Sequence, residues 1–304
     1  MAGAGMQDIK RRIRSVDSTK QITKAMELVS TAKLRKARQR VEENRPYFQK
    51  IEEIIRGIIP HTKELHSPFI EGREIKKAGY IVITGDRGLC GGYNTNAIKK
   101  ALSDMTEKEV SVIAVGQKGV NFFRKRGYDL DGEYTSISEN PQFSDAKSIG
   151  RLAMELFENE MIDEVNLVYT TFISTINHKP TLVKLLPLEE KEVDKEEEAE
   201  KEAAEKKSGN QGEEEQEQEE IMTYEPSAEE VLSYLVPQYV ESMIFGALIE
   251  ASASEQGARR VAMESATDNA EEMIDDLNLK YNRARQASIT QEISEIVGGA
   301  EALK

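Results

Sequence analysis

The sequence has few of the residues that most often carry catalysis or bind metals. It holds one cysteine, Cys90, three histidines and no tryptophan among 304 residues. One thiol excludes a disulfide within the chain and favours a reducing compartment. Cys90, His61, His66 and His178 lack the spacing of metal ligands. We therefore expect no metal site, no cofactor and no catalytic residue.

Long apolar runs are also missing. No stretch reaches the roughly 18 uninterrupted apolar residues of a membrane span, and the N-terminus has no apolar signal core. We therefore expect a soluble or peripheral chain without a direct membrane span. Charged residues make up 32% and hydrophobic residues 38% of the chain. This composition is typical of long solvated helices around a modest core.

The net charge of −14 is unevenly distributed. Residues 189–220 hold sixteen Asp/Glu and five Lys/Arg, a balance of −11, whereas residues 6–56 hold fourteen Lys/Arg and seven Asp/Glu, a balance of +7. The acidic segment has almost no large apolar side chain and cannot offset its ordering entropy by burial. We interpret 189–222 as an acidic mobile insert.

Two long helices are expected at the ends of the chain, over residues 6–59 and 227–297. Each shows a narrow apolar seam, as coiled coils do, and we expect the two to pair antiparallel. In the first helix the seam is read as Ile9, Ile13, Val16, Ile22, Ala25, Val29, Ala32, Ala37 and Val41. In the second it is read as Ala266, Ala270, Met273, Leu277, Tyr281 and Ala284. We expect Pro237 to break off a short first helix and Gly298-Gly299 to end the long one.

Between these helices the sequence alternates strand and helix patterns. The strands are expected at 78–84, 110–115, 128–133, 165–172 and 181–187, and the helices at 94–105, 119–125 and 144–158. Such alternation predicts a mostly parallel sheet covered on both faces. The fold class is therefore α/β plus a long antiparallel coiled coil, with a central Rossmann-like open sheet. The expected domains are 1–59, 60–188, 189–222 and 223–304.

The glycine-rich loop at 85–94 follows a strand and precedes a helix, where phosphates often bind. It matches neither G-x-G-x-x-G nor the P-loop. An alternative function, a Rossmann-type nucleotide enzyme with helical arms, is thus weakly supported. We expect Asp86 and Arg87 to form local loop hydrogen bonds rather than to act as acid and base, and His178 to be a surface histidine.

A basic run follows the middle of the first helix. Its members are Lys33, Arg35, Lys36, Arg38 and Arg40. They spread around most of the helix and could face nucleic acid phosphates, acidic protein loops or only solvent. The aromatic residues that single-strand binding needs are absent here.

Three separated motifs carry a family resemblance. They are the segment 21–29 (QITKAMELV), the loop 85–94 (GDRGLCGGYN), and the segments 285–293 (RQASITQEI) and 295–300 (EIVGGA). The sequence 266–270 (ATDNA) also fits. In this order they resemble the γ subunit of F-type ATP synthases, from end to end apart from the acidic segment.

The resemblance implies the central-stalk rotor shaft of a proton-translocating ATP synthase, which transmits torque and has no active site of its own. The expected partners are the α, β and ε subunits and the membrane c-ring, with no nucleic acid. The expected place is the cytoplasmic face of a bacterial cell membrane, as a peripheral protein. The sequence reveals neither the coupling ion nor the ring stoichiometry.

The resemblance also implies contact residues. Met26 matches a methionine that faces an acidic lever loop of β, and Arg259, Gln286 and Thr290 match positions that hold an α/β loop. The basic run Lys33–Arg40 is expected to add to the β-facing surface.

Two features depart from the family. Gly257 stands where alanine is usual, and we expect it to soften the helix. The acidic segment resembles in place the regulatory insert of chloroplast γ subunits but has no cysteine pair, so thiol switching is excluded. We hypothesise that it biases rotation.

Overall fold

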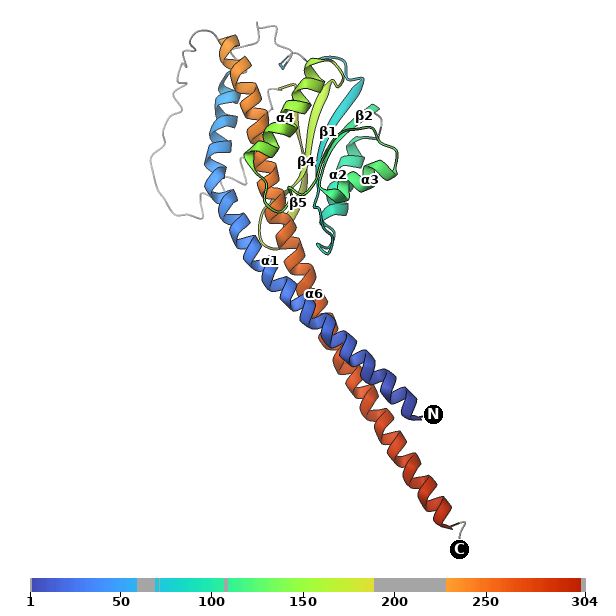
Figure 1. Cartoon of the computed structure of the whole chain (residues 1–304). Coiled ribbons are helices and arrows are strands. Elements are labelled where there is room, and N and C mark those ends of the chain that lie inside the picture. Colours follow the sequence, from blue (N-terminus) through green and yellow to red (C-terminus); the bar gives the residue numbers. More distant parts are fainter. Residues whose placement is uncertain (1, 59–68, 71, 107–108, 189–227, 302–304) are drawn as a thin grey trace.

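The computed structural model describes residues 2–58, 69–70, 72–106, 109–188 and 228–301. Two helices dominate it, α1 (Ala2–Ile58) and α6 (Ala228–Glu301), which run antiparallel and side by side (Figure 1). Both ends of the chain lie at the far end of this pair, and the sheet lies beside its other end. The expected pair of long terminal helices is therefore confirmed.

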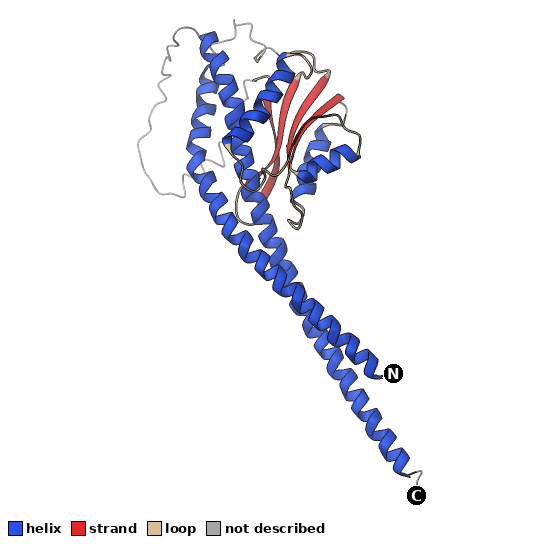
Figure 2. Cartoon of the chain, in the orientation of Figure 1, coloured by secondary structure: helices blue, strands red, loops and turns tan. Residues whose placement is uncertain are grey.

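A five-stranded sheet stands beside the helix pair (Figure 2). The elements between the long helices are β1 (Lys77–Ile83), α2 (Tyr93–Asp104), β2 (Glu109–Val115), α3 (Gln117–Lys125), β3 (Leu130–Tyr134), α4 (Phe143–Glu158), β4 (Glu164–Phe172) and β5 (His178–Leu186). The strand order is β3-β2-β1-β4-β5, and every pairing is parallel except the antiparallel pair β4 and β5. The α/β open sheet agrees with the sequence prediction, and its fifth strand returns as a hairpin.

Alternate residues of β1 face opposite sides of the sheet, as the strand period of two requires. Tyr80 and Val82 pack with residues of α2 and α3. Ile81 and Ile83 pack with residues of α4, α6 and the end of α1. The sheet is therefore buried on both faces, which explains why β1 reads as a continuous apolar run.

The long helices share the core of the sheet. Ile55 and Ile58 of α1 and Val236 and Ile244 of α6 are all at most 2% exposed and belong to one apolar cluster with the sheet. The helix pair is thus built into the α/β layer rather than tethered to it.

The seam of α1 differs from the predicted one in its middle. Ile22 and Val29 are 61% and 55% exposed, while Thr23, Ser30 and Leu34 are buried. The Thr267 hydroxyl of α6 donates to the Thr23 hydroxyl at 2.8 Å. Small hydroxyl side chains let the two backbones approach closely, so the helix pair places them inside and leaves larger apolar residues outside.

The predicted seam of α6 is wrong at one residue, Met273. Met273 is 58% exposed, and its neighbour Ile274 lies on the partly buried face instead. Lys20 forms an exposed ion pair with Glu271 across the two helices, at 2.8 Å. From Ile289 to Ala300 every side chain is exposed, because α6 continues past the N-terminus of α1 (Figure 1).

Two predicted helix ends are also wrong. Pro237 lies inside α6, and Gly298 and Gly299 are helical as well. Around Pro237, the side chains of Val236, Tyr239 and Val240 are buried in the sheet core. That packing offsets the hydrogen bond that proline cannot make. The acidic segment 189–222 lies outside the described residues.

Candidate functional site

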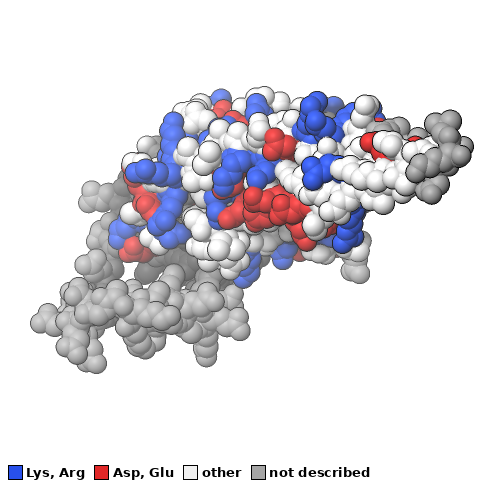
Figure 3. All heavy atoms as spheres, turned by 90° about the horizontal axis from the view of Figure 1, so that it is seen from below, with Lys and Arg blue, Asp and Glu red and all other residues white. Residues whose placement is uncertain are grey.

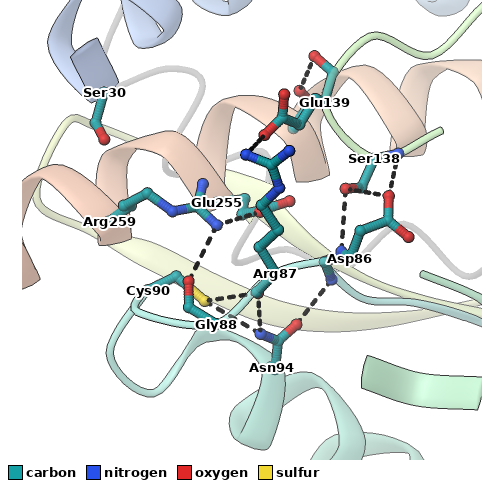
Figure 4. Close-up of polar contacts among 12 residues, drawn as sticks. Ser30, Asp86, Arg87, Gly88, Cys90, Asn94, Ser138, Glu139, Glu255 and Arg259 are labelled. Atoms are coloured by element: carbon teal, nitrogen blue, oxygen red, sulfur yellow. Dashed lines mark hydrogen bonds and ion pairs between the residues drawn. The ribbon is translucent and has the colours of Figure 1, made fainter. Parts of the chain in front are cut away.

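A cluster of polar and charged side chains lies where α1, α6 and two loops of the sheet meet (Figure 4). We call it the polar junction. It consists of Lys33, Asp86, Arg87, Ser138, Glu139, Glu255 and Arg259. The loops start at the carboxyl ends of β1 and β3, and α6 passes across them. Sequence positions far apart are therefore brought into one network.

Asp86 organises the two loops. Its carboxylate accepts hydrogen bonds from the backbone amides of Gln117, Ser136 and Ser138, at 3.0, 2.9 and 3.2 Å, and from the Ser138 hydroxyl at 2.9 Å. Burial by itself would raise the pKa of Asp86, but these four donors outweigh it and lower the pKa below its ordinary value. Asp86 thus has the predicted structural role in hydrogen bonding, but its bonds are not local, because they join its loop to the segments after β2 and β3.

Glu255 and Arg259 form a buried ion pair one helical turn apart. Arg259 Nη2 donates to Glu255 Oε1 at 2.5 Å, and the two side chains are 8% and 1% exposed. The same Nη2 donates to the carbonyl of Gly88 at 3.3 Å. Gly85 makes room for the pair, since a Cβ there would lie 2.8 Å from the Glu255 carboxyl carbon. Burial raises the pKa of Glu255 despite the nearby guanidinium.

Glu139 connects a loop of the sheet to α1. Lys33 Nζ donates to its carboxylate at 2.8 Å, and Arg87 Nη1 lies 3.6 Å from the other oxygen. The hydrogen bond from Lys33 is the main cause that lowers the pKa of Glu139. Arg87 itself is 75% exposed in its side chain.

Two of the predicted contact residues border one groove of about 340 Å³. Met26 and Arg259 both line it, together with Val29, Arg87 and Leu89. Leu89 is 64% exposed and adopts φ +61°, an uncommon conformation for a leucine. The groove therefore combines exposed apolar surface with cationic side chains.

The other two predicted contact residues lie elsewhere. Gln286 and Thr290 are exposed on the distal part of α6. The 27 residues from Arg259 to Gln286 correspond to about 40 Å of helix. Thr290 donates only to the backbone carbonyl of Gln286, at 2.9 Å. The four predicted contact residues therefore form two separate groups.

The basic run of α1 divides into anchored and outward residues. Lys33 is held by Glu139, and Arg40 donates to Asn140 Oδ1 and the Pro141 carbonyl, both at 2.8 Å. Arg38 pairs with Glu42 on its own helix. Arg35 and Lys36 are exposed and form no ion pair among the described residues. Viewed from below in Figure 3, Lys and Arg form several patches, and Asp and Glu lie between and beside them.

The carboxyl edge of β1 and β4 carries a cavity of about 310 Å³, where a nucleotide would sit in a Rossmann-like fold. The described residues that line it include no Lys or Arg, so it offers no cation for a phosphate.

His178 lies at this cavity and is not the surface histidine that we predicted. Its Nε2 is buried without a hydrogen-bond partner among the described residues. Desolvation, helped by Arg260, lowers the pKa of its imidazole. A Cβ on Gly257 would lie 2.4 Å from Nε2. Because Gly257 has no Cβ, the β4–β5 hairpin can pack closely against α6 at this position. The sequence did not indicate this role.

The sequence did not single out Glu255, Ser138, Glu139 or Leu89. The spacing of Glu255 and Arg259 by four residues on a helix is the one signal that pointed to their pairing. No local pattern predicts which loop residues meet them.

Among the described residues, no group of three His, Cys, Asp or Glu could hold a metal ion. One helix segment in the same part of the chain, within Val231–Ala300, is long and apolar enough by composition to cross a membrane, but 56% of its apolar window is buried inside the protein. Packing against the sheet accounts for its apolar character.

The arrangement defines a class of protein: a long antiparallel helical shaft fused to a Rossmann-like domain, with polar surfaces suited to protein partners. Residues 5–303 match the family model described as "ATP synthase". The chain is 63% identical to an ATP synthase gamma chain of Alkaliphilus metalliredigens, over 99% of the chain and 100% of that relative. It is 52% identical to a gamma chain named "sodium ion specific" from Acetobacterium woodii, over 98% of each.

Solved structures agree in fold. A chain of the Tetrahymena thermophila mitochondrial ATP synthase central stalk and c-ring structure aligns with TM-score 0.57 and 25% identity, over 81% of this chain and 99% of that chain. A chain of the Euglena gracilis OSCP/F1/c-ring structure aligns with TM-score 0.66 and 19% identity, over 99% and 95%. The chain belongs to the ATP synthase gamma chain family, whose members are non-catalytic subunits of the ATP synthase complex. The nucleotide-enzyme alternative is not favoured.

Proposed function

We propose that this chain is the rotor shaft that transmits torque between the membrane c-ring and the catalytic β subunits of a bacterial ATP synthase. The observation that supports this most is the burial of both long helices in the core of the sheet. Ile58 of α1 and Val236 of α6 are 0% exposed there. Torque applied to the sheet domain thus passes to the shaft through packed side chains, which resist deformation.

The contact surfaces follow from the same geometry. The groove at Met26, Leu89 and Arg259 would face an acidic loop of β, and Gln286 and Thr290 would face an α/β loop farther along the shaft. Exposed charges such as Arg35 and Arg38 contribute about 0–1 kcal/mol each, which suits contacts that are made and broken as the shaft turns. The sheet domain would contact ε and the c-ring at the cytoplasmic face of the cell membrane.

Reconstitution tests this proposal. The chain is combined with the α and β subunits, a bead is attached to an exposed position of the sheet domain such as Lys100, and the complex is supplied with ATP. We expect co-purification and stepwise rotation of the bead in one direction. A complex that hydrolyses ATP while the bead stays fixed on average would overturn the rotor function.

A further inference from the structure

A second cavity, of about 300 Å³, lies where α1 and α6 meet the loop before α4. Its lining includes the side chains of Lys33, Lys36, Arg40, Glu139 and Gln256. We call it the basic cavity. Three cations and one carboxylate face it, and its volume is at the lower end of the range for small-molecule sites.

The hydrogen bonds around the basic cavity leave most of its positive charge without an anionic partner. Arg40 is fixed by two neutral acceptors, Asn140 Oδ1 and the Pro141 carbonyl, both at 2.8 Å. Lys36 makes no hydrogen bond or ion pair among the described residues. Only Lys33 is paired, with Glu139 at 2.8 Å, so two of the three cations have no anionic partner.

A buried amide adds a further donor to these cations. Gln256 is 2% exposed, and its Nε2 has no hydrogen-bond partner among the described residues. The pKa of Glu139 is lowered, mainly by the hydrogen bond from Lys33 and further by Arg87 and Arg259. The Glu139 carboxylate therefore offsets the charge of Lys33, and Lys36 and Arg40 remain as the cations in excess.

We propose that the basic cavity binds a small oxyanion of the phosphate class, held by Lys36, Lys33 and the amide of Gln256. Ammonium and amide groups are the donors that such an anion accepts, and charge-assisted hydrogen bonds are stronger than neutral ones. This goes beyond the rotor function, which requires no small ligand. The site lies at the junction of α1, α6 and the sheet, so an occupied cavity would stabilise that junction.

Isothermal titration of the full chain tests the site. Phosphate, pyrophosphate and ADP are added at constant ionic strength, with sodium chloride as the reference. We expect saturable binding of phosphate or pyrophosphate, and a loss of at least about tenfold in affinity for Lys36→Gln, since this variant lacks one charge-assisted hydrogen bond to the anion. The matched control is Arg35→Gln, which removes one charge from the adjacent exposed residue outside the cavity; it should change affinity less than about threefold.

Two outcomes would overturn the site: no saturable heat above the chloride reference, or an equal loss of affinity in Arg35→Gln and Lys36→Gln. The titration with ADP identifies the source of the oxyanion. Tighter binding of ADP than of phosphate would assign the cavity to a nucleotide phosphate, and weaker binding would assign it to free phosphate. Circular dichroism of both variants verifies that they fold like the parent chain.

Discussion

At the residue scale, burial decides what each charged side chain contributes. Arg87 is exposed and meets Glu139 at 3.6 Å, whereas Arg259 is buried and bonds Glu255 at 2.5 Å. An exposed pair is screened by water, while a buried pair leaves an uncompensated charge when one partner is removed. Arg259 is thus a positioning residue for the loop at Gly88 as well as a member of the groove.

Replacing Arg259 with alanine should destabilise the protein by about 3–5 kcal/mol, because Glu255 would remain buried without its cationic partner. Urea unfolding of the full chain measures this. The matched control is Arg260→Ala, which breaks an outward pair with Glu264 and should cost at most about 1 kcal/mol. Equal losses in both variants would show that Glu255 does not depend on Arg259.

Asp86→Asn should destabilise the protein in a pH-dependent way. The folded-state pKa of Asp86 is lowered, so its ionised form adds stability above the unfolded pKa of about 3.9, and that stability is lost as pH falls through the folded pKa. Near neutral pH we expect a loss of about 2 kcal/mol. The difference from the parent should shrink toward zero in strong acid. A difference constant from pH 7 to pH 2, measured by chemical unfolding, would contradict this.

Gly257→Ala tests the room that glycine leaves for His178. Helix propensity alone favours alanine by about 1 kcal/mol, but the added Cβ would lie 2.4 Å from His178 Nε2. We expect a net loss of about 1 kcal/mol from overpacking. The double variant Gly257→Ala/His178→Ala should recover the propensity gain in a double-mutant cycle. The control Gly298→Ala, with nothing within 4 Å of a Cβ, should stabilise.

At the scale of elements, the packing of α1 against α6 determines which residues form the buried seam. The buried Thr23 and Ser30 and the partly buried Ala37 of α1 are spaced by seven, as are the buried Leu34 and Val41. This is the heptad repeat of a coiled coil, but two of its positions are hydroxyl residues. Ile22 and Val29, one position earlier, are left on the surface beside Met26. The element thus separates the residues that pair the helices from those available to partners.

Leu34→Ala and Ile22→Ala distinguish the two seams. Leu34 is 5% exposed, so its truncation should cost about 2–5 kcal/mol. Ile22 is 61% exposed, and its truncation should change the free energy of unfolding by less than about 0.5 kcal/mol. Thermal and urea unfolding of the two variants measure the difference. A larger loss of unfolding free energy for Ile22→Ala than for Leu34→Ala would support the seam predicted from the sequence.

At the scale of the whole molecule, the shaft and the sheet domain share one core, while the two proposed partner surfaces lie far apart. The groove at Met26 and Arg259 adjoins the sheet, and Gln286 and Thr290 lie about 40 Å farther along α6. We therefore expect changes at the groove to affect folding as well as the proposed partner contact, and changes at the distal group to affect only the proposed partner contact.

Gln286→Ala combined with Thr290→Ala should leave the free energy of unfolding within about 0.5 kcal/mol of the parent, because both side chains are exposed. In the reconstituted complex, ATP hydrolysis should fall severalfold, since a partner contact is lost. The control is Asn282→Ala, another exposed polar residue of the same helix. An unchanged rate of ATP hydrolysis in the double variant would show that Gln286 and Thr290 do not belong to the contact surface.

The sequence by itself determined the elements: apolar strands, long helical patterns and the order that places a mostly parallel sheet between two helices. These follow from local periodicity, which does not depend on distant partners. Only the tertiary structure decided which face of α1 is buried, that Pro237 stays helical, and that Glu255, Arg259 and Glu139 meet at one junction. Those outcomes depend on which backbones approach closely and which charges lose water, and both are properties of residues far apart in the chain.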